Sequence, residues 1–306
     1  MRAVVVSEFG GPDAVRVVET PVPEPGPGQI RIKVGASALN PVDAGVRAGG
    51  FGGAGETVGL GWDVAGVVDA VSAGTGWAVG DRVVALSYGT VRPLGAHAEY
   101  VVVDASAVAG APTSVDTVHA ATVPLNALTA AQALDLLDLK PGQSLLVTGA
   151  AGAVGGYAVQ LASRQGVTVT GLAGTADATL VRGFGAAHFV SRDAARADTS
   201  ALPVEPGSVD AVLDAAFIGD AALAAVRDGG VHVGVIPGQA PAPVRGVRST
   251  AVAVAADGAR LAELVALVDE GALTPRVAGT YALDDAAKAH ARLAEGGLRG
   301  KLVLIP

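Results

Sequence analysis

The pattern of hydrophobic and polar positions divides the chain near residue 119. Up to that point apolar residues stand in short runs with the alternation of half-buried strands, most regularly where Ile30, Ile32 and Val34 alternate with polar residues. Many short strands separated by Gly and Pro turns predict an irregular β-barrel-like domain. Strands are expected at residues 4–6, 15–18, 29–34, 64–68, 82–86 and 99–103.

Beyond residue 119 the pattern alternates between helices and strands. An Ala- and Leu-rich segment at 119–137 predicts a helix, which Lys140-Pro141-Gly142 ends. Such alternation predicts a parallel sheet covered by helices on both faces. Further helices are expected at 154–165, 176–184, 259–269 and 284–293, and strands at 144–148, 168–170, 209–213, 231–236 and 302–305.

Composition narrows the class of protein. With 306 residues, of which 50% are hydrophobic, the chain has room for two domains. The net charge of −8 disfavours a phosphodiester backbone, so we expect no nucleic-acid partner. Glu8 comes too early for a secretory segment, and no apolar run approaches the ~20 residues of a membrane helix. We therefore expect a cytoplasmic protein with no membrane partner.

The strongest chemical signal is a run of small residues between a predicted strand and a predicted helix. It reads Ala150-x-Gly152-x-x-Gly155, with Ala153 and Val154 inside it. This is the dinucleotide-binding fingerprint with alanine at its first position. The first small residue permits a tight turn, the second lets the backbone approach a pyrophosphate, and the third lets helix and strand pack closely. We predict that these five residues bind a nicotinamide dinucleotide.

The residues after the next strand favour NADP over NAD. The fingerprint expects a carboxylate ~20 positions on, which would bind the ribose 2′-hydroxyl of NAD. That place holds Ala173, Gly174 and Thr175. Without a carboxylate to repel it, a 2′-phosphate can be received there, and Arg182 and Arg192 are two candidates to bind it. The expected cofactor is therefore NADP(H), bound by Gly174, Thr175 and Arg192.

Several sequence blocks in order resemble the medium-chain dehydrogenases/reductases, and within them the zeta-crystallin-like quinone oxidoreductases. The resemblance implies an α/β protein in which residues 1–119 and 263–306 form a GroES-like β-barrel catalytic domain. A Rossmann domain with a doubly wound parallel sheet, residues 120–262, is inserted between them. The matching blocks, besides the glycine-rich turn, are 2–5, 10–12, 38–43, 61–68, 79–83, 98–100, 128–130, 183–186 and 300–304.

That family has a zinc branch and a zinc-free branch, and the resemblance implies the zinc-free one. The zinc branch uses a Cys and a Gly-His-Glu motif, where this chain has Asn40 and Gly61-Trp62-Asp63. The chain contains no cysteine, and its five histidines show no ligand spacing. Without a metal electrophile, the expected chemistry is hydride transfer from NADPH to a quinone or another conjugated carbonyl acceptor.

The resemblance also implies roles for three separated residues. Asn40 would face the nicotinamide and hydrogen-bond the acceptor carbonyl, although a turn-capping asparagine before Pro41 is an equal interpretation. Thr129 would contact the nicotinamide, with helix capping or packing as the alternative. Lys301 would lie at the floor of the cofactor cleft, with a surface lysine as the alternative. We interpret Asp43 and Arg47 as a structural ion pair one helical turn apart.

Two departures from the family keep other functions open. Many relatives bind the 2′-phosphate with a Lys and a Tyr. At those two positions this chain has Ala178 and Arg192. A tyrosine used by some enoyl reductases after the Asn-x-x-Asp motif is missing, and Tyr88 is the nearest one. The alternatives are an enoyl or enone reductase of a thioester or natural-product intermediate, and a non-catalytic, crystallin-like NADPH-binding protein. The family further implies a homodimer, formed through an edge strand at 231–236 or 252–254.

Overall fold

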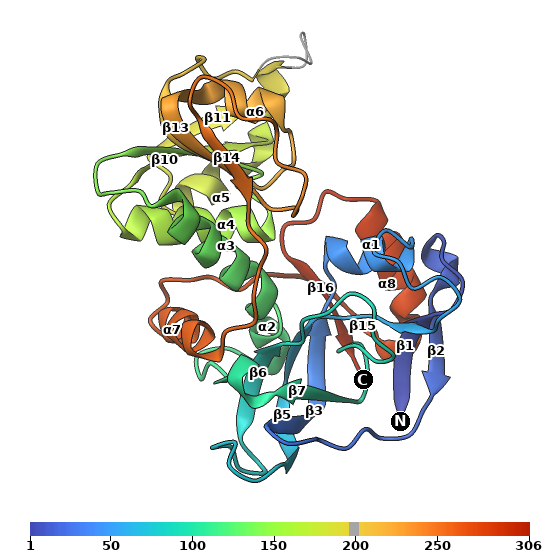
Figure 1. Ribbon diagram of the computed structural model, residues 1–306. Helices are drawn as coiled ribbons and strands as arrows, with labels where there is room; N and C mark the ends of the chain where they lie inside the picture. Colours follow the sequence, from blue (N-terminus) through green and yellow to red (C-terminus); the bar gives the residue numbers. More distant parts are fainter. Residues whose placement is uncertain (196–201) are drawn as a thin grey trace. The chain divides into compact units, whose positions relative to one another are not determined.

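The computed structural model describes residues 1–195 and 202–306, and these form two compact units (Figure 1). The first comprises residues 1–128 and 255–306, and the second comprises residues 129–254; the expected boundaries were 119/120 and 262/263. The α/β architecture with an inserted parallel sheet is confirmed. In the described part of the chain, every helix is too short or too polar to cross a membrane.

The first unit is built around β3 (Gln29–Ala38), the longest strand, which contacts three others. Its predicted alternation is confirmed, because Ile30, Ile32 and Val34 are buried between more exposed neighbours. The main sheet runs β15 (Val277–Ala282), β16 (Lys301–Ile305), β3, β5 (Asp63–Val71), β6 (Arg82–Leu86) and β8 (Val108–Gly110), with β7 (Tyr100–Asp104) on β3. A second sheet runs β2 (Arg16–Glu19), β1 (Arg2–Val6) and β4 (Val58–Gly59).

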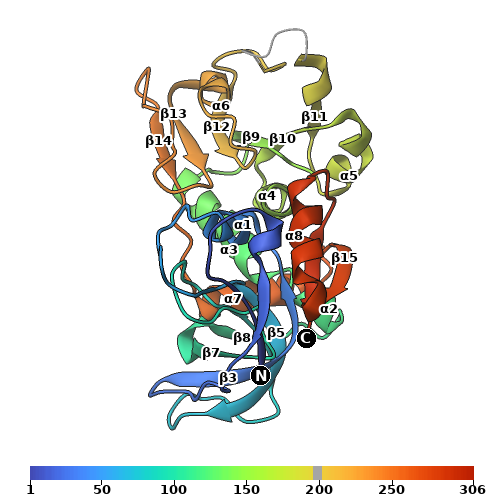
Figure 2. The same cartoon turned by 90° about the vertical axis from the view of Figure 1, so that its right-hand side faces the viewer.

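Both ends of the chain contribute to one apolar core in this unit. Leu302 and Leu304 of β16 pack with Val4 and Val6 of β1. The helices α1 (Pro41–Arg47) and α8 (Ala286–Ala294) cover this core, and α8 lies beside β15 in Figure 2. Two further helices of the unit are α2 (Thr117–Ala120) and α7 (Gly258–Asp269). The C-terminal strand therefore brings its own side chains next to those of the first 60 residues.

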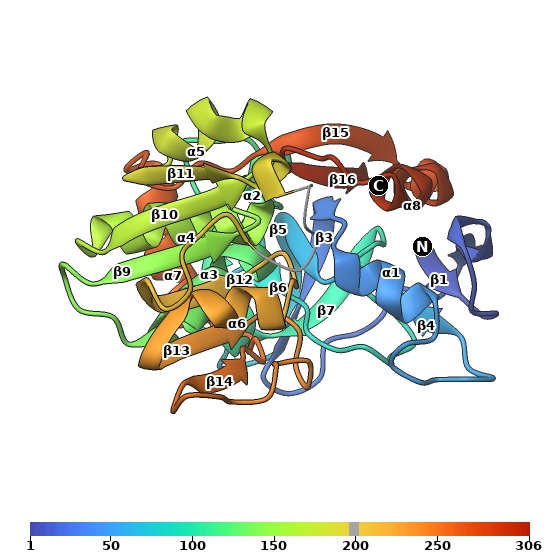
Figure 3. The ribbon, with the colours of Figure 1, turned by 90° about the horizontal axis from the view of Figure 1, so that it is seen from above.

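The second unit is a parallel sheet of six strands, which can be followed in order in Figure 3. The order is β11 (His188–Ser191), β10 (Thr168–Ala173), β9 (Ser144–Thr148), β12 (Val209–Asp214), β13 (Val226–Gly234) and β14 (Arg248–Ala251). The helices α4 (Ala153–Arg164), α5 (Ala178–Gly183) and α6 (Asp220–Ala225) pack against neighbouring strand pairs. The order reverses at β9, so the turn after β9 lies where such sheets bind ligands.

Two expectations about secondary structure were wrong. The helix expected over 119–137 is broken into α2 and α3 (Pro124–Leu137), since Pro124 has no N–H to continue a helix and starts a new one instead. The expected edge strand at 231–236 lies largely in β13, which is covered on both sides by β12 and β14. The edge is β14 itself, and residues 252–254 follow it.

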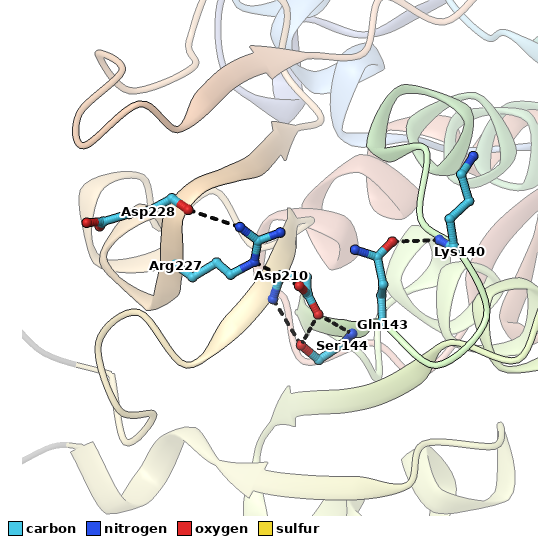
Figure 4. A network of polar contacts seen from close by, with 6 residues as sticks. All are labelled: Lys140, Gln143, Ser144, Asp210, Arg227 and Asp228. Carbon is cyan, nitrogen blue, oxygen red and sulfur yellow. Dashed lines mark hydrogen bonds and ion pairs between the residues drawn. The ribbon is translucent and has the colours of Figure 1, made fainter.

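A polar network fixes the register of the central strands at their N-terminal ends (Figure 4). Asp210 accepts hydrogen bonds from the backbone N–H and the hydroxyl of Ser144, both at 2.8 Å, and from Arg227 Nε at 2.8 Å. These donors, led by the Ser144 N–H, lower the pKa of Asp210 to about 2. The network holds β12 against β9, so that Asp214 lies opposite Thr148 at the other end, beside the glycine-rich turn.

Candidate functional site

The small-residue turn lies between β9 and α4, where the fingerprint requires it. Gly152 is the N-cap of α4, and Ala153, Val154 and Gly155 form its first turn. A Cβ on Gly155 would lie 2.3 Å from the backbone oxygen of Gly149, so only glycine allows this closeness of helix and turn. A Cβ on Gly152 would meet just that oxygen, at 3.1 Å, and otherwise open space. A helix N-terminus that follows such a turn is a common binding position for an anionic group.

A buried carboxylate supports the turn from the neighbouring strand. Asp214 accepts a hydrogen bond from Thr148 Oγ1 at 2.6 Å and from the backbone N–H of Gly219 at 2.8 Å. Burial opposes its ionisation, but these bonds and the nearby His232 ring keep its pKa below the usual value. Thr148 Oγ1 in turn accepts the backbone N–H of Ala216 at 2.9 Å. Asp214 thus orders the loop that follows β12 alongside the turn.

Gly174 and Thr175 follow β10, and Arg192 comes close to Gly174 from the end of the neighbouring strand β11. The Arg192 guanidinium is exposed and lies 3.7 Å from the Cβ position of Gly174. Arg182, the other candidate, stacks instead over the Phe189 ring at 5.5 Å. Arg192 is therefore the better placed of the two arginines to meet a phosphate.

Sequence reasoning missed a carboxylate at this strand end. Asp193 accepts hydrogen bonds from the Thr175 N–H and hydroxyl, both at 2.8 Å, and lies 3.9 Å from Arg192. It comes from the end of β11, 18 residues after Thr175. The fingerprint counts positions along one strand only, so it could not signal a carboxylate supplied by the next. The environment of Thr175 is thus less favourable to a phosphate than its own sequence suggested.

In the first unit, Asn40 lies at the centre of a buried polar cluster. It is the N-cap residue of α1, but its side chain does not cap the helix. Its Nδ2 donates to Asp63 Oδ2 at 2.8 Å, and its Oδ1 accepts from Asn126 Nδ2 at 3.0 Å and from Lys301 Nζ. Asp63 also accepts the backbone N–H of Leu125 at 2.6 Å. Asn40 therefore links three side chains rather than closing a turn.

The cluster holds one positive and one negative charge out of water. Burial raises the pKa of Asp63 to about 6, with the Lys301 charge opposing that rise. Burial lowers the pKa of Lys301 to about 8, with Asp63 and then Asp43 opposing that fall. Between these values both groups are ionised. Lys301, expected at the floor of the cofactor cleft, is thus neither a surface lysine nor an isolated one, because its ammonium is bound to Asn40.

Asp43 has a different role from the one expected. It accepts the backbone N–H of Asn40 at 2.7 Å and that of Gly61 at 2.9 Å. Arg47 instead donates to the backbone oxygen of Gly10 at 3.1 Å and to His290 Nδ1 at 3.2 Å. The expected pair between Asp43 and Arg47 was wrong, because Asp43 turns inward to join α1 to the segment before β5.

The predicted site residues thus fall into three groups. Ala150, Gly152, Ala153, Val154 and Gly155 share one turn; Gly174 and Thr175 follow β10, with Arg192 near Gly174 from the end of β11; and Asn40 lies with Lys301. Thr129 is a nearly buried residue of α3 and the first residue of the second unit. Asn126 carried no signal in the sequence. Asp63 lies in one of the blocks that resemble the family, where it stood out only as the residue in place of the zinc motif's Glu.

Comparison with known proteins gives two family matches. Residues 26–113 match the alcohol dehydrogenase GroES-like domain, and residues 184–304 match the family described as zinc-binding dehydrogenase. Each match lies on a different part of the chain, and both descriptions concern dehydrogenases.

Individual relatives match over the full chain. An NADPH-dependent alkenal/one oxidoreductase of Arabidopsis thaliana is 33% identical, with 100% of this chain and 80% of the relative covered. A quinone oxidoreductase of Pseudomonas aeruginosa is 30% identical, with 100% and 99% covered. Among solved structures, a mycobacterial protein complexed with NADPH is 31% identical, with a TM-score of 0.83 and 100% of both chains covered.

Proposed function

Because this chain belongs to the medium-chain dehydrogenase/reductase family, in its quinone oxidoreductase-like branch, and is an NADP-dependent oxidoreductase, we propose a specific reaction for it. It reduces a quinone or another conjugated carbonyl compound with NADPH and uses no zinc. The observation that carries this proposal is the buried ammonium of Lys301, bound to Asn40 and balanced by Asp63.

Each unit carries one set of residues that the proposed reaction needs. In the second unit, the N-terminus of α4 at Gly152 suits the pyrophosphate, and Arg192 beside Gly174 suits the 2′-phosphate. The bound nicotinamide supplies the hydride. In the first unit, Lys301 and Asn126 supply N–H donors that converge on one point, the Oδ1 of Asn40.

Those donors suit an acceptor whose carbonyl oxygen gains negative charge. When a conjugated carbonyl is reduced, charge develops on its oxygen, and hydrogen-bond donors held in a buried site stabilise that charge. The Lys301 ammonium and the Asn126 amide are donors of this kind, and the Asp63 carboxylate keeps Lys301 protonated in a buried setting. An acceptor oxygen would bind by taking over their hydrogen bonds from Asn40 Oδ1.

The residues at the expected metal position do not fit zinc. They are an amide, an indole and one carboxylate, those of Asn40, Trp62 and Asp63, and the chain has no thiolate to add. Asn40 already binds the Lys301 ammonium, which would repel a second cation. Across residues 1–195 and 202–306, no three His, Asp or Glu side chains gather in a way that would hold a metal ion.

A cofactor and acceptor panel tests the proposal. NADPH should raise the melting temperature more than NADH does, because it adds contacts to Arg192. NADPH consumption should be fastest with quinones, slower with alkenals and enones, and slowest with enoyl thioesters. Alkenals are the second candidate acceptors, supported by the Arabidopsis relative. Stabilisation by NADPH without turnover of any acceptor would favour the crystallin-like function, and no stabilisation by either nucleotide would contradict the proposal.

Asp193 makes a separate prediction about cofactor preference. Replacing Asp193 with asparagine removes a negative charge beside Thr175 and frees Arg192, so NADPH affinity should rise about threefold, the scale of an exposed charge pair. NADH affinity should not change. Isothermal titration of both nucleotides measures this, with Asp228→Asn as the matched control, an exposed aspartate near the start of β13. An equal gain for NADH, or a loss for NADPH, would contradict the prediction.

A further inference from the structure

The ring of Tyr88 is an exposed aromatic feature of the segment that follows β6. Its side chain is 56% exposed, while the indole of Trp62 behind it is buried at 6% exposure. The two rings meet edge to face, with centroids 5.0 Å apart and planes at 68°. Such a pair stabilises both rings beyond the area that it buries. One ring therefore stands in solvent on a rigid aromatic support.

Arg92 holds the segments that carry both rings. Its guanidinium donates to the backbone oxygen of Gly61 at 2.8 Å, and to the backbone oxygen and hydroxyl of Ser87 at 2.6 and 2.7 Å. Gly61 precedes Trp62, and Ser87 precedes Tyr88. Arg92 is half-buried, and partial burial lowers its pKa to about 10. These three hydrogen bonds from one guanidinium join the two segments and so fix the position of the ring pair.

The ring pair is continuous with the polar cluster through the backbone. Trp62 directly precedes Asp63, the partner of Asn40, and Asp63 pairs with Leu86 in the β5–β6 ladder. The Ser87 N–H donates to the Trp62 oxygen at 2.7 Å, which extends that ladder to Tyr88. On its other side, Gly61 donates to Asp43, which also accepts the Asn40 N–H. The segment from Gly61 to Asp63 therefore carries both Trp62, which packs against the Tyr88 ring, and Asp63, which binds Asn40.

We infer that Tyr88 is the platform on which the acceptor's ring stacks, with Trp62 as its support and Arg92 as the residue that positions both. This inference rests on the proposed function and narrows its substrate class. A flat ring stacks on an exposed phenol ring over its whole face, whereas a short aliphatic alkenal offers little to stack. The preferred acceptors are therefore ring quinones, such as naphthoquinone, and not short-chain alkenals.

Steady-state kinetics with two acceptors tests the platform. Tyr88→Ala should raise the KM for naphthoquinone about tenfold, the scale of one aromatic contact, with kcat changed less than about twofold. The KM for crotonaldehyde should stay the same. Tyr88→Phe keeps the ring and should restore the KM for naphthoquinone. Arg92→Lys, which loses the planar fork, should raise the same KM and leave that for crotonaldehyde unchanged. Val79→Ala, at an exposed apolar residue between β5 and β6, is the control.

A binding measurement separates failure of this inference from failure of the proposed function. Trp62 and Trp77 are the two tryptophans of the chain, so Trp77→Phe leaves Trp62 as the single indole. Naphthoquinone should quench its fluorescence saturably, and Tyr88→Ala should weaken that binding. Saturable quenching without turnover of any acceptor would overturn the proposed function and leave the platform standing. A KM for naphthoquinone that Tyr88→Ala leaves unchanged would overturn the platform, as would a loss of kcat in Tyr88→Phe, which would assign the role to the hydroxyl.

Discussion

Replacing Lys301 with methionine is expected to lower kcat by about 100-fold, the usual cost of losing one buried donor that stabilises a developing oxyanion. Methionine fills a similar volume but cannot donate a hydrogen bond or carry charge. Asn126 would remain as a donor, so turnover should fall and not vanish. Stopped-flow measurement of NADPH oxidation with saturating quinone gives the rate of the chemical step. Lys288→Met, at an exposed lysine of α8, is the matched control and should keep its rate.

The pH profile of kcat gives a second test of Lys301, because it reports the protonation state of that residue. Lys301 must be protonated to donate, so activity should fall as pH rises through about 8, its lowered pKa. Asp63 must be ionised to support that charge, so activity should also fall as pH drops through about 6. The profile is bell-shaped. Lys301→Met should lose the alkaline limb, and an unchanged limb would assign it to another group.

Stability measurements distinguish a catalytic loss from a folding defect. Lys301→Met leaves the Asp63 carboxyl buried without its cation, which should cost about 3 kcal/mol of unfolding free energy. The double variant Asp63→Asn Lys301→Met removes both charges and should regain most of that stability while staying slow. Recovery of turnover along with stability would show that Lys301 acts only in folding.

The pKa directions also give the sign of the effect on stability. Between about pH 8 and 10.5 the folded chain has released the Lys301 proton while the unfolded chain has not, so Lys301 makes the unfolding free energy rise with pH there. Between 3.8 and about 6 the folded chain holds the Asp63 proton while the unfolded chain has released it, so Asp63 makes the unfolding free energy fall as pH rises. The double variant should lack both slopes in urea titrations.

The second large effect is expected at the glycine-rich turn. Gly155→Ala places a Cβ 2.3 Å from the Gly149 oxygen and 2.8 Å from its carbon, and these are backbone atoms that side-chain rotation cannot move. The helix α4 must shift away from the turn, which should cost about 3 kcal/mol of unfolding free energy. NADPH affinity should fall with it, because the N-terminus of α4 is displaced. Urea denaturation and nucleotide titration measure the two losses.

Two other glycines serve as controls for that variant. Gly152→Ala places its Cβ 3.1 Å from the Gly149 oxygen, so it should weaken NADPH binding at the helix N-terminus with little loss of stability. Gly183→Ala, in α5, meets nothing within 4 Å and should be neutral or slightly stabilising. If Gly155→Ala resembled Gly183→Ala, close packing would not be the reason for glycine at position 155.

Local features of this protein could be predicted from the order of residues alone. The turn from Ala150 to Gly155 lies directly between its strand and its helix in the chain. The spacing of its small residues was therefore enough to predict the close packing of helix and strand. The alternation at Ile30, Ile32 and Val34 likewise determined which face of β3 is buried. The break between α2 and α3 was missed although its signal, Pro124, was local, because composition favoured one long helix.

Tertiary structure alone decided which polar side chains meet. Asn40, Asp63, Asn126 and Lys301 come from four segments, and the contact between Asn40 and Lys301 spans 261 residues. No spacing rule relates such positions, because strand pairing and not chain distance places β16 beside β3. The same holds for Asp193, which reaches Thr175 from the neighbouring strand. The sequence by itself therefore determined the small-residue turn between β9 and α4, whereas the fold decided which charge lies beside Asn40 and which carboxylate lies beside Thr175.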